Sequence, residues 1–313
     1  MKKPSFDPGL TQQFTGSLRR AINKDGSFNV RRRGTHWRDT HPYLHMINMR
    51  WLPFLTVLFL LYLAVNTIFA AIYYSLGPGN LTGAEGTTEW DQFLNAFFFS
   101  AHTLTTVGYG SISPRGTAAN LLAALEAMTG LMGFALATGL LFGRFSKPSA
   151  RIGFSERMLV VPYQGGLSLQ FRIVNLRDNV LMDLEAKLLL MTVEGPPGQL
   201  SRRYHALNLE RDKVLFFPLT WTIVHPIDES SPLRGKTPAE WEALQAEILI
   251  QLKGYDDTFS QTVNVRHSYR YDEVVPDARF RPSFHTDEAG DMVLHVDRVG
   301  TFERVPPQPA LEA

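Results

Sequence analysis

The chain has 313 residues and a nearly balanced charge, with 31 Lys and Arg side chains against 30 Asp and Glu side chains. It contains no cysteine, which excludes disulfide bonds and any metal or thiol chemistry that depends on cysteine. The balanced total hides an asymmetry, because residues 1–51 carry ten basic side chains and only three acidic ones.

The basic N-terminal stretch leads into an apolar segment, which indicates a cytoplasmic location by the positive-inside rule. Nucleic-acid binding is the competing interpretation of these arginines, and the adjacent span makes it the weaker one, so we expect no nucleic-acid partner. Residues 1–35 contain Pro, Gly, Ser and charge without apolar periodicity, which predicts a flexible segment. Residues 36–50 mix apolar and polar side chains, which predicts an interfacial helix; a polar linker before an early transmembrane start is the alternative.

Two long apolar segments predict a transmembrane pore domain over residues 51–145. The first span covers residues 51–76 and has no charge after Trp51, which is enough to cross a ~30 Å hydrocarbon core. An external, Gly-containing turret follows at residues 77–87, and the second span covers residues 118–145. Because basic residues recur after the second span, we expect both termini in the cytoplasm and the chain in the cell (inner) membrane.

Between the spans, Thr88 to Asp91 has the residues of a helix start, with acidic side chains in the first turn. The helix predicted over residues 90–104 is too short to cross a bilayer. At membrane depth it is tolerated only when protein surrounds it, which predicts a re-entrant pore helix. Its C-terminal end, the negative end of the helix dipole, favours a nearby cation.

The stretch after this helix, Thr106–Gly110, reads Thr-Val-Gly-Tyr-Gly, the sequence with which potassium channels coordinate a dehydrated ion through backbone carbonyls. Carbonyls that point at one axis require a backbone that alternates in handedness, and glycine adopts φ > 0 at little cost. Gly108 and Gly110 supply these positions, while Val107 and Tyr109 turn away from the axis. K⁺ ions are the expected ligands, coordinated by Thr106, Val107, Gly108 and Tyr109. A chance turn is the alternative, and the position between two spans disfavours it.

The second span contains one acidic residue, Glu126, which is costly in a membrane unless it is paired or faces water. We expect Glu126 to form hydrogen bonds behind the filter, with His102 as the nearest titratable candidate partner. Phe134, Thr138 and Phe142 recur at i, i+4 and i+8 and are candidates for hydrophobic constrictions, with packing against a neighbouring helix as the alternative. Glycines in this span serve either close packing or hinge motion: Gly130, Gly133, Gly139 and Gly143.

After a linker at residues 146–154, short alternating apolar runs separated by turn signals predict an all-β immunoglobulin-like sandwich over residues 155–300. A capping box with Pro at the first helical position, Thr237 to Glu240, predicts one helix inside this domain. Residues 301–313 form a C-terminal tail. The predicted strands are residues 158–163, 167–174, 186–193, 216–224, 248–252, 262–266 and 292–296.

Three further segments, Thr220–Leu233, Phe171–Arg177 and Arg144–Pro148, carry a family resemblance. Together with the filter they make the chain similar to inward-rectifier potassium channels, in particular their prokaryotic (KirBac) branch, over about residues 35–300. The resemblance implies a homotetramer with one central pore, extended by β-sandwich domains into the cytoplasm. It implies a channel that conducts K⁺ passively and is gated where the inner helices cross, under the control of the cytoplasmic domain and membrane lipids. Residues 36–50 correspond to the family's slide helix.

The resemblance also implies roles for individual residues. Phe142 corresponds to the gate residue, with Phe134 as a second constriction, and Gly130 and Gly139 occupy the two inner-helix glycine positions treated as hinges. An anionic phospholipid is a candidate ligand, and each basic side chain near it contributes about 1 kcal/mol. Setting the topology is an equally good role for these side chains. Besides K⁺ we expect no organic cofactor. The candidate lipid residues are Arg50, Trp51, Arg144, Lys147 and Arg151.

The chain departs from the family pattern at three positions. Phe134 occupies the place of the acidic residue on which strong rectification depends. His102 replaces the glutamate that supports the filter in many relatives, and Ile112 replaces that glutamate's arginine partner, so this salt bridge cannot form. His102 and Glu126 are therefore the candidates for filter support.

Two other functional classes compete with an ion channel. His225, Asp228 and Ser230 suggest a hydrolase triad, but they lie on no nucleophile elbow, and the chain has no HExxH or Walker A motif. We therefore expect no enzyme activity. A membrane-anchored sensor that conducts little or no current is the other alternative, and the intact filter sequence argues against it.

Overall fold

The computed structural model describes residues 9–13, 16, 20–31, 33–34, 36, 41–147, 150–196 and 199–306. The chain forms two compact units, which are described separately. One is Arg33–Lys147, the pore unit, and the other joins Met1–Arg32 to Pro148–Ala313, the β unit. The predictions for residues 1–8, 37–40 and 307–313 lie outside the described residues.

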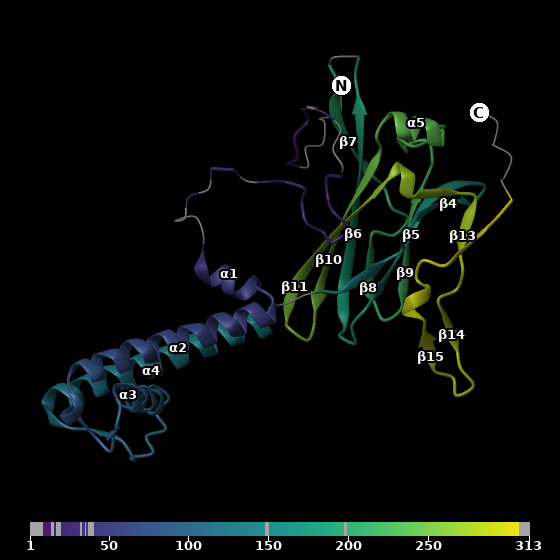
Figure 1. The fold of residues 1–313 in the computed structure, drawn as a ribbon. Coiled ribbons are helices and arrows are strands. Elements are labelled where there is room, and N and C mark those ends of the chain that lie inside the picture. Colours follow the sequence, from purple (N-terminus) through teal and green to yellow (C-terminus); the bar gives the residue numbers. More distant parts are fainter. Residues whose placement is uncertain are drawn as a thin grey trace. The chain divides into compact units, whose positions relative to one another are not determined.

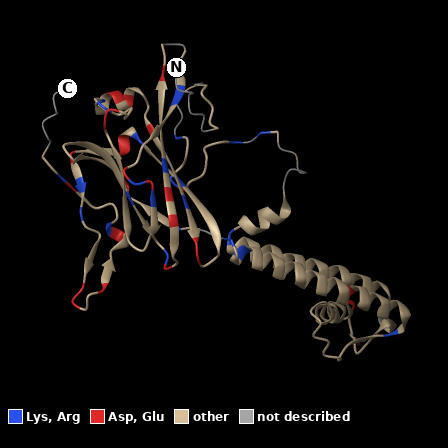
Figure 2. Cartoon of the chain, turned by 180° about the vertical axis from the view of Figure 1, so that it is seen from behind, with Lys and Arg blue, Asp and Glu red and all other residues tan. Residues whose placement is uncertain are grey.

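The pore unit consists of helices α1 (Pro42–Asn48), α2 (Trp51–Ser75), α3 (Glu89–Leu104) and α4 (Gly116–Phe145). Among the described residues, α2 and α4 are the two helices that are long and apolar enough to cross a membrane. They lie side by side, and α3 packs against both at one end (Figure 1). Charged side chains are nearly absent from α2 and α4, in contrast to the β unit (Figure 2).

Local sequence sets the bounds of the short helix α3. Thr88 accepts a hydrogen bond from the Asp91 amide, and the Asp91 carboxylate accepts one from the Thr88 amide, which completes a capping box. Ala96 and Phe99 on α3 pack against Ala70 and Tyr73 of α2. Between the helices, the 3₁₀ turn η2 (Pro78–Asn80) leads into β1 (Leu81–Thr82), which pairs with β2 (Ser113–Pro114) on the far side of the filter.

The β unit has two main sheets. The first has the strand order β11-β10-β6-β7, with β8 also paired to β6; the second has the order β12-β4-β5-β3, with β9 also paired to β5. The first sheet is antiparallel and contains β6 (Leu181–Glu194), β7 (Ser201–Leu207), β8 (Lys213–Phe216), β10 (Glu247–Asp256) and β11 (Gln261–Arg270). The second contains β3 (Ile152–Phe154), β4 (Met158–Tyr163), β5 (Gly166–Asn175), β9 (Thr220–Pro226) and β12 (Val274–Pro276).

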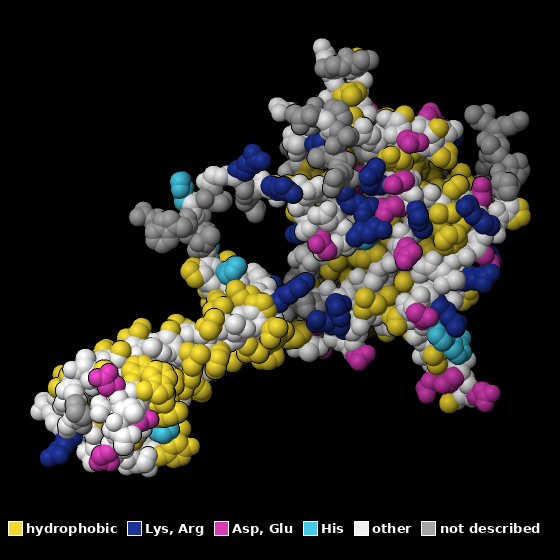
Figure 3. Space-filling model, viewed as in Figure 1, with side chains coloured by type: hydrophobic (Ala, Val, Ile, Leu, Met, Phe, Trp, Pro, Cys, Tyr) yellow, Lys and Arg dark blue, Asp and Glu magenta, His cyan; other side chains and the backbone are white. Residues whose placement is uncertain are grey.

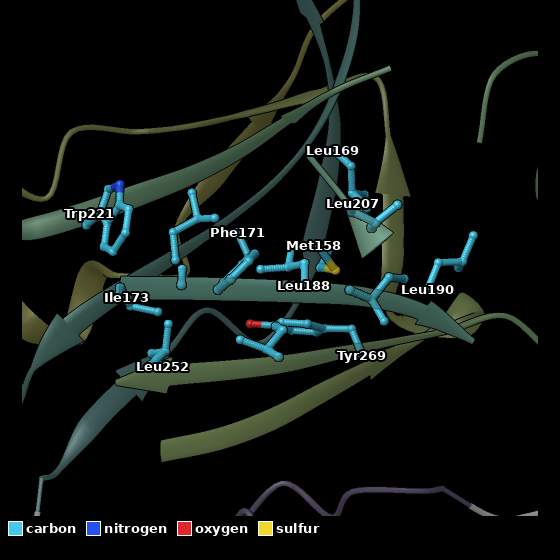
Figure 4. Packing of buried hydrophobic residues seen from close by; sticks show 14 of the residues in the cluster. Met158, Leu169, Phe171, Ile173, Leu188, Leu190, Leu207, Trp221, Leu252 and Tyr269 are labelled. Atoms are coloured by element: carbon cyan, nitrogen blue, oxygen red, sulfur yellow. The ribbon is translucent and has the colours of Figure 1, made fainter. Parts of the chain in front are cut away.

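The core lies between these two sheets, which confirms the predicted sandwich. Along β9 burial alternates, so that Trp221 and Ile223 point inward. They meet Phe171 and Ile173 of β5, with Leu188 of β6 and Tyr269 of β11 from the other sheet (Figure 4). The predicted helix is α5 (Pro238–Ala243), and its capping box between Thr237 and Glu240 is present.

Shorter elements follow β11 at the end of the chain. The 3₁₀ turns are η3 (Tyr271–Glu273) and η4 (Val296–Arg298). Two small antiparallel pairs complete the unit: β13 (Ala278–Phe280) with β16 (Phe302–Arg304), and β14 (Phe284–Thr286) with β15 (Met292–Leu294).

Part of the N-terminal segment is packed, which differs from the expectation of a flexible stretch over residues 1–35. Ile22 is buried, and the Ala21 amide donates to the Glu247 carboxylate at 2.9 Å. The Ile22 carbonyl accepts a hydrogen bond from Ser268 at 2.6 Å, and Arg20 pairs with Glu273. Sequence periodicity could not reveal this packing, because the partners of this segment lie more than two hundred residues further along the chain.

Candidate functional site

The backbone of Thr106–Gly110 alternates in handedness. φ is +60° at Thr106, +57° at Gly108 and +81° at Gly110, so every second residue lies in the left-handed region. The sequence predicted this for the two glycines but not for Thr106, because a β-branched residue rarely adopts φ > 0. Such a conformation costs about 1–3 kcal/mol and persists only where the surroundings enforce it. The repeat of two residues is what turns successive carbonyls toward a common axis.

The end of α3 enforces this backbone by hydrogen bonds. The His102 carbonyl accepts the amides of both Val107 and Gly108, at 3.0 and 3.2 Å. The Thr106 amide donates to the Thr103 carbonyl at 3.0 Å. The last carbonyls of a helix otherwise lack partners, and here the filter amides satisfy them. Residues 106–108 are therefore held by hydrogen bonds to the C-terminal end of α3.

His102 also contacts the filter through its side chain. Its ring meets the Tyr109 ring edge to face, with centroids 4.8 Å apart and an interplanar angle of 89°. The hydrogen-bond partners of Glu126 are other residues, so the candidate pairing of His102 with Glu126 is not observed. The two residues contact different parts of the pore unit.

Glu126 lies in a buried polar cluster that joins the three long helices of the pore unit. Its carboxylate accepts hydrogen bonds from Tyr73 of α2, at 2.8 Å, and from Ser100 of α3. The Asn66 side-chain oxygen lies 3.1 Å from the Ser100 hydroxyl. All four side chains are buried. Asn66, Tyr73 and Ser100 stand out in the sequence as polar residues within otherwise apolar helices. Which of them contacts Glu126 can be known only once the arrangement of the helices is known.

The glycines of α4 divide into two kinds. A Cβ on Gly130 would lie 2.0 Å from the Leu104 carbonyl oxygen, so α4 crosses the end of α3 in direct backbone contact. A Cβ on Gly143 would lie 2.7 Å from the Tyr43 hydroxyl of α1. A Cβ on Gly139 would meet nothing within 4 Å. Close packing thus explains Gly130 and Gly143, whereas of the two hinge candidates, Gly130 and Gly139, only Gly139 has open space around it.

The aromatic stripe of α4 is exposed in the single chain. Phe134 is 75% exposed and Phe142 is 72% exposed, and Thr138 between them is exposed as well. Their spacing places all three on one helix face. Among the described residues of the pore unit nothing covers this face, which leaves it free to line a pore or to contact another copy of the chain.

Comparison with known proteins decides the family. The family model described as "Inward rectifier potassium channel C-terminal domain" matches residues 152–313, and the model described as "Ion channel" matches residues 57–147. The inward rectifier potassium channel Kirbac3.1 of Paramagnetospirillum magnetotacticum is 35% identical over 283 residues, covering 89% of this chain and 94% of that protein. The chain belongs to the inward rectifier potassium channel family.

Animal members of the family are more distant. The G protein-activated inward rectifier potassium channel 3 of Homo sapiens is 29% identical over 323 residues, covering 96% of this chain and 82% of that protein. The human inward rectifier potassium channel 18 is 28% identical over 259 residues, covering 75% of this chain and 59% of that protein. The family is one of ion channels rather than enzymes, and the resemblance to its prokaryotic branch is confirmed.

Within this channel, Arg144 at the end of α4 has partners inside the pore unit. Its guanidinium donates to the carbonyls of Ile47 and Met49, at 3.1 and 2.7 Å, and to that of Met46. It also lies 4.6 Å from the centroid of the Trp51 ring and 4.3 Å from that of Phe54. Arg144 therefore links the C-terminal end of α4 to the connection between α1 and α2 by hydrogen bonds.

The other candidate lipid residues remain accessible. Arg50 and Lys147 are exposed in the pore unit, where Lys147 donates to the Asn48 side chain at 2.5 Å. Trp51 is 46% exposed, and its ring lies 5.1 Å from that of Phe145. Arg151 is exposed in the β unit. These four side chains are thus accessible to lipid.

His225, Asp228 and Ser230, the residues that suggest a hydrolase triad, instead hold the chain around the end of β9 by hydrogen bonds. His225 is buried, with Nδ1 2.5 Å from the Asn208 carbonyl oxygen and Nε2 2.8 Å from the Ser231 hydroxyl. Burial lowers the pKa of His225, which favours the neutral ring. Asp228 instead accepts hydrogen bonds from Ser230, which holds a turn. The three residues do not assemble as a triad, because their side chains are committed to different partners.

Proposed function

We propose that this chain forms a homotetrameric pore that conducts K⁺ passively through carbonyl oxygens of Thr106 to Tyr109. The alternating backbone of residues 106–110 supports this proposal most strongly. Four copies around one axis give rings of carbonyls that replace the hydration shell of the ion. The C-terminal ends of four α3 helices add negative dipole ends that favour a cation at the centre.

The gate is assigned to the exposed aromatic face of α4. In a tetramer Phe142 narrows the cytoplasmic end of the pore, and Phe134 forms a second apolar ring. Rings of this kind close a pore by excluding water rather than by charge. Gly139 is the candidate hinge, since close packing within the chain does not account for a glycine there.

The membrane faces the apolar surfaces of α2 and α4, which the space-filling view shows along the pore unit (Figure 3). Both termini lie in the cytoplasm of a cell-membrane channel, and helix α1 lies along the inner leaflet. Arg50, Lys147 and Arg151 attract anionic phospholipid, and Trp51 anchors the interface. Arg144 acts indirectly, because it ties α1 to the end of the gate helix.

Rubidium uptake into potassium-loaded liposomes that contain the purified protein tests the central proposal. We expect uptake that external barium blocks and that external sodium does not compete. The same vesicles, prepared with and without anionic lipid, test the lipid contacts. Phe142→Ala opens the gate, so that a closed wild-type pore still gives uptake in the variant. Absence of uptake in both forms contradicts conduction and favours the non-conducting sensor.

A further inference from the structure

The hairpin of β14 and β15 carries two histidines on one face. The register pairs His285 with Val293, and the His295 amide donates to the Ser283 carbonyl just beyond the strand end, at 2.7 Å. His285 and His295 are therefore diagonal cross-strand neighbours, which point to the same side of the hairpin. Figure 3 shows histidine side chains at the surface of this hairpin, accessible from solvent.

The two rings meet through their nitrogens. His285 Nδ1 lies 3.1 Å from His295 Nε2, and the ring planes differ by only 13°, with centroids 5.1 Å apart. The rings are therefore nearly parallel, and these two nitrogens lie within hydrogen-bonding distance of each other. A metal ion bound between them would be coordinated by one nitrogen of each ring, after small rotations that turn both lone pairs toward it.

The separation of the nitrogens fits one metal ion. With metal–nitrogen bonds of about 2.0–2.1 Å, a nitrogen separation of 3.1 Å gives an N–metal–N angle of roughly 95–100°. This angle lies between those of square-planar and tetrahedral coordination, so small ring rotations suit either geometry. We propose that His285 and His295 form a binding site for one divalent transition-metal ion of the zinc, nickel or copper class.

The remaining ligands are waters. Asp287 lies in the turn of the hairpin, where its carboxylate accepts the amides of Ala289 and Asp291 at 2.9 and 2.8 Å. Within the described residues no group of three His, Asp or Glu side chains could hold a metal. A site of two imidazoles with open positions selects ions that accept nitrogen ligands and discriminates against Mg²⁺, which requires oxygen.

A bound ion would cross-link β14 to the end of β15. The base of this hairpin is already attached to the sandwich, since the Ser283 hydroxyl lies 3.1 Å from that of Thr220 on β9. The ion would add a second closure further along the hairpin, where each strand spans only three residues. Occupancy of the site therefore stiffens the hairpin against the β unit.

Calorimetric titration of untagged, metal-stripped full-length protein in detergent tests the site. We expect one Zn²⁺ or Ni²⁺ per chain in the wild type and no heat with Mg²⁺. His285→Gln and His295→Gln should each weaken this binding at least about tenfold, because one imidazole alone makes a poor site. His205→Gln on β7 is the matched control, and it removes an exposed histidine of the same unit without change in binding.

Copper electron paramagnetic resonance gives an independent readout that does not depend on the variants. The wild-type spectrum should show splitting from two equivalent imidazole nitrogens. Wild-type affinity in both hairpin variants, loss of binding in His205→Gln, or splitting from a single nitrogen would each overturn the proposal. Unchanged melting temperatures of the three variants without metal exclude unfolding as the cause of lost binding.

Discussion

The pore unit and the β unit place their apolar side chains in opposite ways. In the β unit the two sheets close on each other, and their large side chains form one continuous core. In the pore unit most apolar side chains of α2 and α4 point outward, and the buried side chains include the polar cluster around Glu126. The β unit thus folds around its own core, whereas the pore unit leaves most of its apolar surface exposed in the single chain, where the membrane and the proposed tetramer would cover it.

The difference predicts where substitutions act on transport and where they act on folding. In the pore unit, transport depends on the backbone geometry of residues 106–110 and on the close approach of α3 and α4. A single added methyl group at either place should therefore reduce transport. In the β unit, stability depends on burial and on the protonation of buried groups. The following substitutions test this contrast, beginning with the largest effect.

Gly108→Ala should abolish selective flux. At φ +57° a Cβ costs about 1–2 kcal/mol for each copy, and four copies meet in one filter. Rubidium uptake should fall at least tenfold, an order-of-magnitude expectation from this strain. Gly133→Ala is the matched control on α4, where an added Cβ meets nothing within 4 Å, and it should retain uptake. Wild-type selectivity in Gly108→Ala would refute the filter assignment.

Gly130→Ala separates packing from hinge motion. The new Cβ would lie 2.0 Å from the Leu104 oxygen, so α3 and α4 must move apart next to the filter. We expect a strong loss of barium-sensitive uptake together with a lower melting temperature. Gly139→Ala has open space and should leave the melting temperature unchanged. If both variants keep the wild-type melting temperature and lose flux equally, the hinge interpretation of both glycines holds instead.

Glu126→Leu should destabilise the pore unit by several kcal/mol. The substitution leaves the hydroxyls of Tyr73 and Ser100 buried without their acceptor, at a cost of about 1–3 kcal/mol each. Glu126→Gln keeps an oxygen acceptor and should be much milder. Thermal unfolding in detergent measures both. Equal stability of the leucine variant and the wild type would show that the cluster contributes nothing.

His267 should make the stability of the β unit depend on pH. Burial lowers its pKa from 6.5 to about 4, since the ring lies parallel to Phe154 at 4.2 Å and near the basic Lys24 and Arg20. Below pH 6.5 the unfolded chain binds a proton that the folded chain binds only near pH 4. The free energy of unfolding therefore falls as pH drops through this window, by up to about 3 kcal/mol.

Urea unfolding followed by tryptophan fluorescence checks this dependence, because Trp221 and Trp241 lie in the β core. His267→Gln should remove most of the slope between pH 6.5 and 4, while other groups leave a residual one. His205→Gln, on the exposed side of β7, should keep it. An identical slope in His267→Gln and the wild type would assign the acid sensitivity to other residues.

The same contrast explains what could be predicted from the sequence. The spans, the helix start at Thr88, the capping box at Thr237 and the long strands β4, β5, β6, β9, β10 and β11 follow from local composition and periodicity, and the structure contains them. The left-handed Thr106 could not be predicted, because its conformation depends on hydrogen bonds from the filter to the end of α3. Local preference alone assigns φ > 0 to glycine.

Contacts between side chains on different helices also could not be predicted from the sequence. The sequence indicates that Glu126 needs polar partners, but Tyr73 and Ser100 are brought to it only by the packing of α2 and α3. Arg144 has the appearance of a free basic residue at a membrane boundary. Its carbonyl partners, such as Met49, lie almost a hundred residues earlier in the chain. Residue type indicates which groups need partners, and tertiary structure decides which ones they find.

The reversal potential under bi-ionic conditions, with K⁺ on one side of a bilayer and Na⁺ on the other, tests the central claim most directly. If the backbone of residues 106–110 selects K⁺, the current of the wild-type protein should reverse far from zero, with the sign of a potassium electrode. The Phe142→Ala channel should show the same potential with more current, since the gate does not choose the ion. Reversal near zero in both proteins would contradict the account.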